Sequence, residues 1–111
     1  MKVDTRTQGG ELTPSLLEHI ERCLSFGLDW THQDVSRVVI NLSDINGPRG
    51  GNDKRCQLRI PLSRMRDVLI YEVADDLHVA IARAVDRAAR SLERRLSRQR
   101  EFGPTPSSIE E

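Results

Sequence analysis

The sequence is poor in the residues that would direct it to several large classes of protein. Aromatic residues make up only 4% of the 111 positions, so aliphatic side chains must fill the core. Two cysteines, Cys23 and Cys56, are too few for a disulfide framework. No apolar run reaches the ~18 residues of a membrane span, and residues 1–10 lack the apolar stretch of a secretory signal. We therefore expect a cytoplasmic, reduced protein without a membrane partner.

An excess of charge of either sign is also missing. The chain has 17 basic and 17 acidic residues and a net charge of zero, whereas a simple nucleic-acid binder is usually basic overall. Charged residues still reach 31%, enough to coat every exposed face. The length allows one domain, in which a single sheet packs against one or two helices.

The spacing of apolar residues predicts six elements. Alternation predicts strands over residues 2–7, 35–43, 54–62 and 67–73. Thr13-Pro14 is typical of a helix start and Gly27 of a helix stop, and a second helical pattern runs over about residues 75–100. This β-α-β-β-β-α order favours an α+β fold, a two-layer sandwich with a four-stranded sheet and both helices on one face. We expect the domain to span residues 1–102, with a disordered tail over 103–111.

The third expected strand has two distinct faces. Cys56, Leu58, Ile60 and Leu62 point one way, and Arg55, Gln57 and Arg59 point the other. The turn formers of residues 44–53 predict an exposed loop before this strand. The fourth strand does not reveal which of its faces is buried.

Charge is unevenly distributed along the chain. Residues 47–66 hold six basic and one acidic residue, a net charge of +5, and residues 83–100 hold seven basic and two acidic residues, again +5. Residues 1–46 carry −3, residues 67–82 carry −4, and residues 101–111 carry −3. The neutral total therefore hides two basic segments.

Five arginines of the last helix form a stripe. Arg83, Arg87, Arg90, Arg94 and Arg98 fall within about 80° of the helix circumference, along a line about 22 Å long. The apolar residues of the helix form a second stripe, centred roughly 140° around the helix from the middle of the arginine stripe. One side of the helix therefore docks on the sheet while another presents guanidinium groups. Like charges at this spacing repel, and a helix built only for folding would interleave glutamates.

Two readings of this stripe remain open from the residues alone. Charge runs are usually solvated faces, but arginine also matches phosphate oxygens with a rigid, bidentate fork. A second cluster, formed by Arg49, Lys54, Arg55 and Arg59, suggests a footprint in two parts. An anionic partner is therefore favoured modestly over a solvated face.

Two short segments of the last expected helix form a recognisable pattern: residues 76–81 (Asp-Leu-His-Val-Ala-Ile), followed by 86–92 (Asp-Arg-Ala-Ala-Arg-Ser-Leu). This pattern resembles the last-helix signature of the ribosome hibernation-promoting factors, a family that includes the ribosome-associated inhibitor called protein Y. Residues 11–14 (Glu-Leu-Thr-Pro), the strand around 38–42, and the loop and strand of 44–56 also resemble members of the family. The resemblance runs from residue 1 to about residue 100, and the chain is similar to a short form.

The resemblance implies a fold similar to double-stranded-RNA-binding domains and a non-catalytic role. Members of that family occupy the messenger- and transfer-RNA channel of the small ribosomal subunit. They thereby block translation and keep ribosomes idle in stressed or stationary cells. It implies contacts with 16S rRNA and no cofactor or small-molecule substrate. By resemblance, the RNA-binding residues are Arg83, Arg87, Arg90, Arg94 and Arg98, with Lys54, Arg55 and Arg49 as a second group.

Other sites are less well supported. His19 and Cys23 have the spacing of a ligand pair on one helix, but no Cys-x-x-Cys or His-x-x-x-His pair is present, so we expect no metal. Residues 47–51 are rich in glycine but lack the Gly-Lys-Ser/Thr ending of a phosphate loop. No catalytic signature surrounds either thiol, and we expect no enzyme. The alternative function is a protein-interaction module, in which the arginine stripe meets an acidic protein or a second copy.

Overall fold

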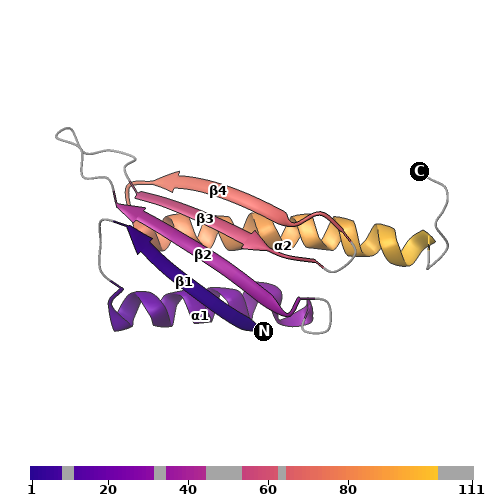
Figure 1. The fold of residues 1–111 in the computed structure, drawn as a ribbon, viewed down its shortest axis with the longest axis horizontal. Coiled ribbons are helices and arrows are strands. Elements are labelled where there is room, and N and C mark those ends of the chain that lie inside the picture. The colour runs from indigo at the N-terminus through magenta and orange to yellow at the C-terminus, as the bar shows by residue number, and fades with distance from the viewer. Residues whose placement is uncertain (9–11, 32–34, 45–53, 63–64, 103–111) are drawn as a thin grey trace.

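The computed structural model describes residues 1–8, 12–31, 35–44, 54–62 and 65–102. The expected loop over residues 45–53, which contains Arg49, and the expected tail over 103–111 lie outside the described residues. The elements are β1 (Lys2–Gln8), α1 (Pro14–Leu28), a short 3-10 turn η1 (Asp29–Thr31), β2 (Arg37–Asp44), β3 (Lys54–Ile60), β4 (Val68–Ala74) and α2 (Leu77–Phe102). Figure 1 shows their arrangement. The predicted order is confirmed, and the strand boundaries move by only one or two residues.

The four strands form one mixed sheet in the order β1-β2-β3-β4. Strand β1 runs parallel to β2, with Thr5 opposite Ile40, while β2, β3 and β4 are antiparallel neighbours. A parallel pair cannot be joined by a tight turn, and the connection from β1 to β2 passes through α1. In the strand order of this sheet, β1 and β4 are the two edge strands.

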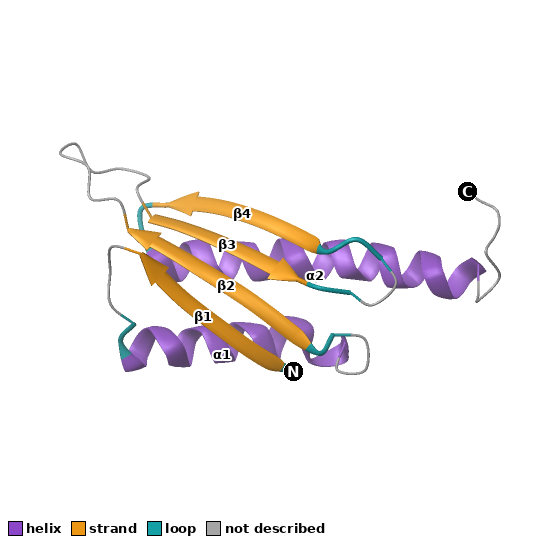
Figure 2. Ribbon diagram, in the orientation of Figure 1, coloured by secondary structure: helices purple, strands orange, loops and turns teal. Residues whose placement is uncertain are grey.

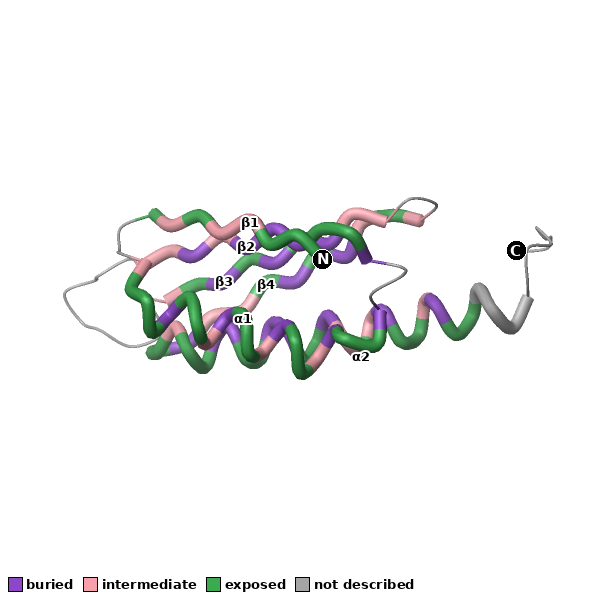
Figure 3. The backbone as a smooth tube through the Cα atoms, turned by 90° about the horizontal axis from the view of Figure 1, so that it is seen from below, coloured by how far each residue is buried: buried purple, intermediate pink, exposed green. Residues whose placement is uncertain are grey.

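Both helices lie on one face of the sheet, as Figure 2 and Figure 3 show. Helix α2 packs on β3 and β4 and lies beside α1, so the predicted two-layer α+β sandwich is confirmed. Leu58 on β3 and Leu92 on α2 are fully buried at the centre of the core. The core is aliphatic, as the shortage of aromatics requires: it includes Leu16, Ile20, Leu24, Leu28, Val38, Ile40, Leu42, Ile60, Ile70, Ile81, Val85 and Leu96.

The end of α1 differs from the prediction. Gly27 lies inside the helix, which continues to Leu28 and then into η1. A Cβ atom at Gly27 would lie 2.9 Å from Cγ1 of Val85, so this glycine allows α1 and α2 to approach closely. Trp30 is 43% exposed, and its indole N–H donates to the Gly27 carbonyl at 2.8 Å. The aromatic ring therefore helps to close the helix end.

The helix N-termini follow the sequence signals. Thr13 precedes Pro14, and its Oγ1 accepts a hydrogen bond from the Leu16 amide at 3.1 Å. In α2, Asp76 has the same role: its Oδ1 accepts from the His78 amide at 2.8 Å. This hydrogen bond holds the pKa of Asp76 below its ordinary value. The cap explains why α2 begins at Leu77, two residues later than expected.

Candidate nucleic-acid interface

The five arginines of the predicted stripe are all exposed, because α2 places its apolar residues against the sheet. Ile81, Ala88 and Leu92 are fully buried on the opposite side of the helix. The predicted separation of an apolar side from a basic side is therefore confirmed. The arginines nevertheless divide into two groups by what their guanidinium groups contact.

Arg83, Arg94 and Arg98 project from α2 without an intramolecular ion pair to any of the described residues. We call these three residues the free arginines. They lie on the side of α2 that faces away from the sheet, and no described carboxylate neutralises them. A row of unpaired, permanently charged guanidinium groups is suited to successive phosphates of a nucleic-acid backbone.

Arg87 belongs to the same stripe but is held by the domain itself. Its Nη1 donates to Glu72 Oε2 at 2.5 Å and to the Tyr71 carbonyl oxygen at 3.1 Å, both on β4. The Glu72 side chain is only 16% exposed, so its carboxylate depends on this partner. Arg87 therefore fastens α2 to the edge of the sheet, and its guanidinium is not freely available to a ligand.

Arg90 is an intermediate case. Its Nη2 lies 3.2 Å from Asp86 Oδ2, one helical turn away. Both side chains are more than half exposed, at 71% and 60%, and such pairs on a helix surface are weak and screened by salt. A phosphate can therefore compete for Arg90.

Arg95 was missed by the sequence reading. It is half-buried, and its Nη1 donates to the carbonyl oxygens of Arg66 at 2.5 Å and Asp67 at 3.4 Å. The sequence signal for this structural role is the angular position of Arg95, which lies roughly 100° from the centre of the arginine stripe and toward the apolar side of the helix. Arg95 thus holds the segment that leads into β4.

The second expected group is not one cluster. Lys54 and Arg55 are neighbours on β3, and their side chains point to opposite faces of the sheet. Lys54 lies on the helix-covered side, where Nζ is 2.6 Å from Oδ1 of Asp44. Arg55 is exposed on the outer face, together with Arg59. Lys54 and Arg55 therefore do not form one surface patch, and their assignment to RNA stays a prediction.

The outer face of the sheet carries further basic residues that the sequence reading did not group. Arg6 on β1 and Arg37 on β2 are exposed there. Strand alternation alone could have placed each on a face, but only the β1–β2 register brings them beside β3.

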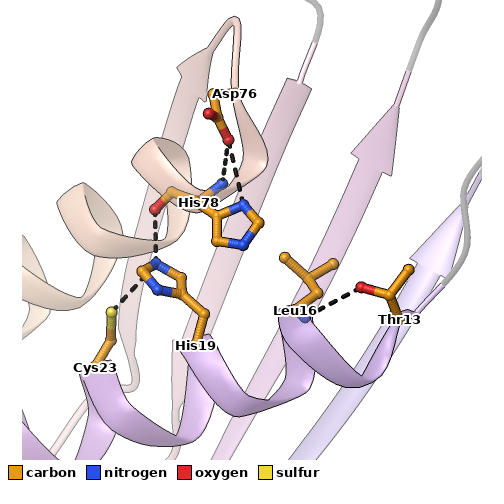
Figure 4. A network of polar contacts seen from close by, with 6 residues as sticks. All are labelled: Thr13, Leu16, His19, Cys23, Asp76 and His78. Atoms are coloured by element: carbon orange, nitrogen blue, oxygen red, sulfur yellow. Dashed lines mark hydrogen bonds and ion pairs between the residues drawn. The ribbon is translucent and has the colours of Figure 1, made fainter.

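The junction of the two helices contains His19 and Cys23, the two residues with the spacing of a ligand pair (Figure 4). His19 Nε2 is 3.0 Å from the His78 carbonyl oxygen and 3.5 Å from Cys23 Sγ, and the two imidazole centroids are 4.6 Å apart. Partial burial raises the pKa of the Cys23 thiol, which disfavours the thiolate that a metal needs. No group of three potential metal ligands occurs among the described residues. The histidine instead connects α1 to the start of α2.

Cys56 lies in the core of β3, as its place in the strand pattern predicts. It is fully buried, and burial raises the pKa of its thiol to about 12. A thiol with this pKa is protonated at neutral pH and is a poor nucleophile. Cys56 therefore serves packing.

The element order, the one-sided helical layer and the exposed arginines define a two-layer α+β domain with a basic helix surface. The sequence pattern of the family described as "Sigma 54 modulation protein / S30EA ribosomal protein" matches residues 3–100, and the chain belongs to this family. This confirms the resemblance found in the sequence.

Solved structures share the fold. The N-terminal domain of Protein Y from Thermus thermophilus is 24% identical with a TM-score of 0.69, covering 85% of this chain and 98% of that chain. A ribosomal subunit interface protein from Coxiella burnetii is 22% identical with a TM-score of 0.64, covering 91% and 99%. No curated protein matches the chain. Within the described part of the chain, no helix has the length and apolarity required to cross a membrane.

Proposed function

We propose that the protein is a non-catalytic, ribosome-associated factor that binds 16S rRNA of the small subunit. The observation that carries this proposal is the row of free arginines, Arg83, Arg94 and Arg98, on the outward side of α2. Family membership and the fold shared with a ribosomal subunit interface protein support the ribosome as the partner.

The mechanism follows from the geometry of a rigid body with a charged side. Phosphate contacts hold the domain in the messenger- and transfer-RNA channel, where its folded volume excludes both RNAs. Arg90 adds a fourth contact when phosphate displaces Asp86, whereas Arg87 maintains the fold. The result is inhibition of translation and stabilisation of idle ribosomes in stressed or stationary cells.

The test is co-sedimentation with purified ribosomal subunits. Arg94→Gln/Arg98→Gln removes two free arginines, and Arg22→Gln/Arg66→Gln removes two exposed arginines elsewhere, so the variants have equal net charge. We expect the first pair to weaken small-subunit binding at least about tenfold and the second to leave it within about twofold. Equal binding by both variants would refute the proposal.

A salt titration of the same binding distinguishes the alternative protein-interaction module. Each lost phosphate contact should reduce the slope of log affinity against log salt by about one unit. The Arg94→Gln/Arg98→Gln variant should therefore show a slope about two units shallower than the wild type. A slope that is the same for the wild type and the variant would contradict phosphate contacts by Arg94 and Arg98, and would leave the protein-interaction module as the candidate function.

A further inference from the structure

The face of the sheet that the helices do not cover is strongly basic. Figure 3 shows both helices on one side, which leaves the other side of all four strands open. Five basic residues and one acidic residue point outward, a net charge of +4. They are Lys2, Arg6, Arg37, Arg55 and Arg59 against Asp4. The one carboxylate is already neutralised, because Arg37 Nη2 lies 2.6 Å from Asp4 Oδ2.

One row across this face combines three kinds of chemistry. The register places Arg6 opposite Asn41, Asn41 opposite Gln57, and Gln57 opposite Tyr71. An arginine on one edge strand and an aromatic ring on the other thus flank two side-chain amides. These four residues, together with Arg55, line a hollow of about 250 Å³.

Tyr71 is the only tyrosine of the chain, and it is 51% exposed in a protein with very few aromatics. Its backbone is fixed, because the Tyr71 carbonyl accepts a hydrogen bond from Arg87 of α2 at 3.1 Å. The ring therefore stands on a rigid strand beside the amide of Gln57. An exposed ring on a sheet is suited to stacking with an unpaired nucleic-acid base.

The neighbouring groups suit the rest of a nucleotide. Side-chain amides offer both a donor and an acceptor, and can pair with the edge of any base that is not already paired. Guanidinium groups hold phosphates on either side of that base. Duplex RNA hides its base faces within the helical stack, so the tyrosine and the amides favour a single strand.

We infer that the outer face of the sheet binds single-stranded RNA. One base stacks on Tyr71, Asn41 and Gln57 hydrogen-bond to its edge, and Arg6 and Arg55 hold the adjacent phosphates. A protein partner suits this face less well, because it would have to supply several carboxylates to match a net charge of +4, whereas an RNA strand carries a phosphate at every nucleotide. The free arginines point away from the sheet, so the protein has two RNA-binding surfaces on opposite sides.

The first experiment measures binding of a labelled oligouridylate of about ten nucleotides to the full chain, without ribosomes. It is carried out in the Arg94→Gln/Arg98→Gln background to reduce phosphate contacts with α2. Tyr71→Ser should weaken binding at least about tenfold, and Tyr71→Phe should retain it, since stacking needs only the ring. Leu69→Ser is the matched control, because Leu69 is 63% exposed on the same face and strand but lies outside the hollow.

The second experiment uses the single tyrosine as a reporter. Protein labelled with 3-fluorotyrosine gives one ¹⁹F resonance from Tyr71, which should shift with the single strand and much less with a blunt duplex of the same length. An unmoved resonance, or equal affinities for Tyr71→Ser and Leu69→Ser, overturns the inference. A shift that depends only on protein concentration also overturns it and indicates a second copy on this face. None of these outcomes depends on subunit binding by the free arginines, which is measured separately.

Discussion

The arginines of helix α2 serve opposite purposes. Arg87 and Arg95, which we call the held arginines, donate to groups on β4 and on the segment before it. Arg83, Arg94 and Arg98 have no such partner among the described residues. Angular position alone does not separate the two groups, because Arg87 lies between Arg94 and Arg98 around the helix. An arginine of this stripe stabilises the fold where an acceptor on β4 lies within its reach, and elsewhere it remains available to a ligand.

The comparison also predicts different effects for substitutions in the two groups. Substitution of a held arginine should lower the free energy of unfolding, and ribosome binding should change only through the loss of folded protein. Substitution of a free arginine should weaken binding while the free energy of unfolding stays almost constant. Of the four predictions that follow, the last three test this division.

The largest effect on stability is expected where α2 meets α1. Gly27→Ala places a methyl group 2.9 Å from Cγ1 of Val85, a stiff side chain that is 3% exposed. We expect a loss of about 2 kcal/mol in the free energy of unfolding, measured by urea denaturation. Ser25→Ala, at an exposed site on the same helix, is the control. Adding Val85→Ala to Gly27→Ala should produce less destabilisation than the sum of the two single changes, and full additivity would contradict the close approach.

A smaller effect is expected from the bond between α2 and β4. Arg87→Gln leaves the half-buried Glu72 carboxylate without its partner and should cost about 1 kcal/mol, since the pair is partly solvated. Adding Glu72→Gln to Arg87→Gln should restore part of the loss, because the unpaired charge is then removed. Thermal and urea denaturation of the four proteins gives the coupling energy. A coupling energy of zero would mean that Arg87 is as free as Arg83.

A third effect, smaller still, is expected at Arg95. Arg95→Gln removes two hydrogen bonds to main-chain carbonyls but leaves no buried charge, so the cost should be about 0.5 kcal/mol. The change should be local, and hydrogen exchange should increase for amides near Arg66 and Asp67 more than for those of β2. Uniform acceleration across the sheet would contradict a local role.

The smallest effect is expected for the free arginines. Arg83→Gln/Arg94→Gln/Arg98→Gln should change the free energy of unfolding by less than about 0.5 kcal/mol. Lost repulsion between Arg94 and Arg98, one helical turn apart, contributes a few tenths of a kcal/mol in favour of the variant. Urea denaturation at low salt measures the difference. A large destabilisation would show that these arginines are held like Arg87.

Much of the architecture could be predicted from the sequence, because periodicity reports on local structure. The alternation of β3 correctly assigned Leu58 to the core and Arg59 to the outer face. The helical spacing of α2 correctly separated its basic and apolar sides. Gly27 was misread because a small residue is equally typical of a helix end and of a close contact between helices, and sequence does not distinguish the two.

The candidate site was less predictable, since its residues meet through tertiary packing. The partner of Arg87 depends on where α2 lies relative to β4, which no local pattern records. Lys54 and Arg55 were grouped because they are adjacent in sequence, although adjacent strand residues point to opposite faces. The row from Arg6 to Tyr71 is brought together by the pairing registers of three pairs of strands, and the sequence of a single strand does not contain them. Arg49 lies outside the described residues, and its assignment stays a prediction.

The hydrogen bond from Arg87 to the Tyr71 carbonyl has a consequence for self-association. Edge strands such as β4 present main-chain groups that can pair with a strand from another molecule, and an exposed Leu69 increases that tendency. The guanidinium of Arg87 occupies one of these carbonyls and places a positive charge along the strand. A residue that the family resemblance assigns to RNA thus occupies an acceptor of the β4 edge and hinders the addition of a strand there.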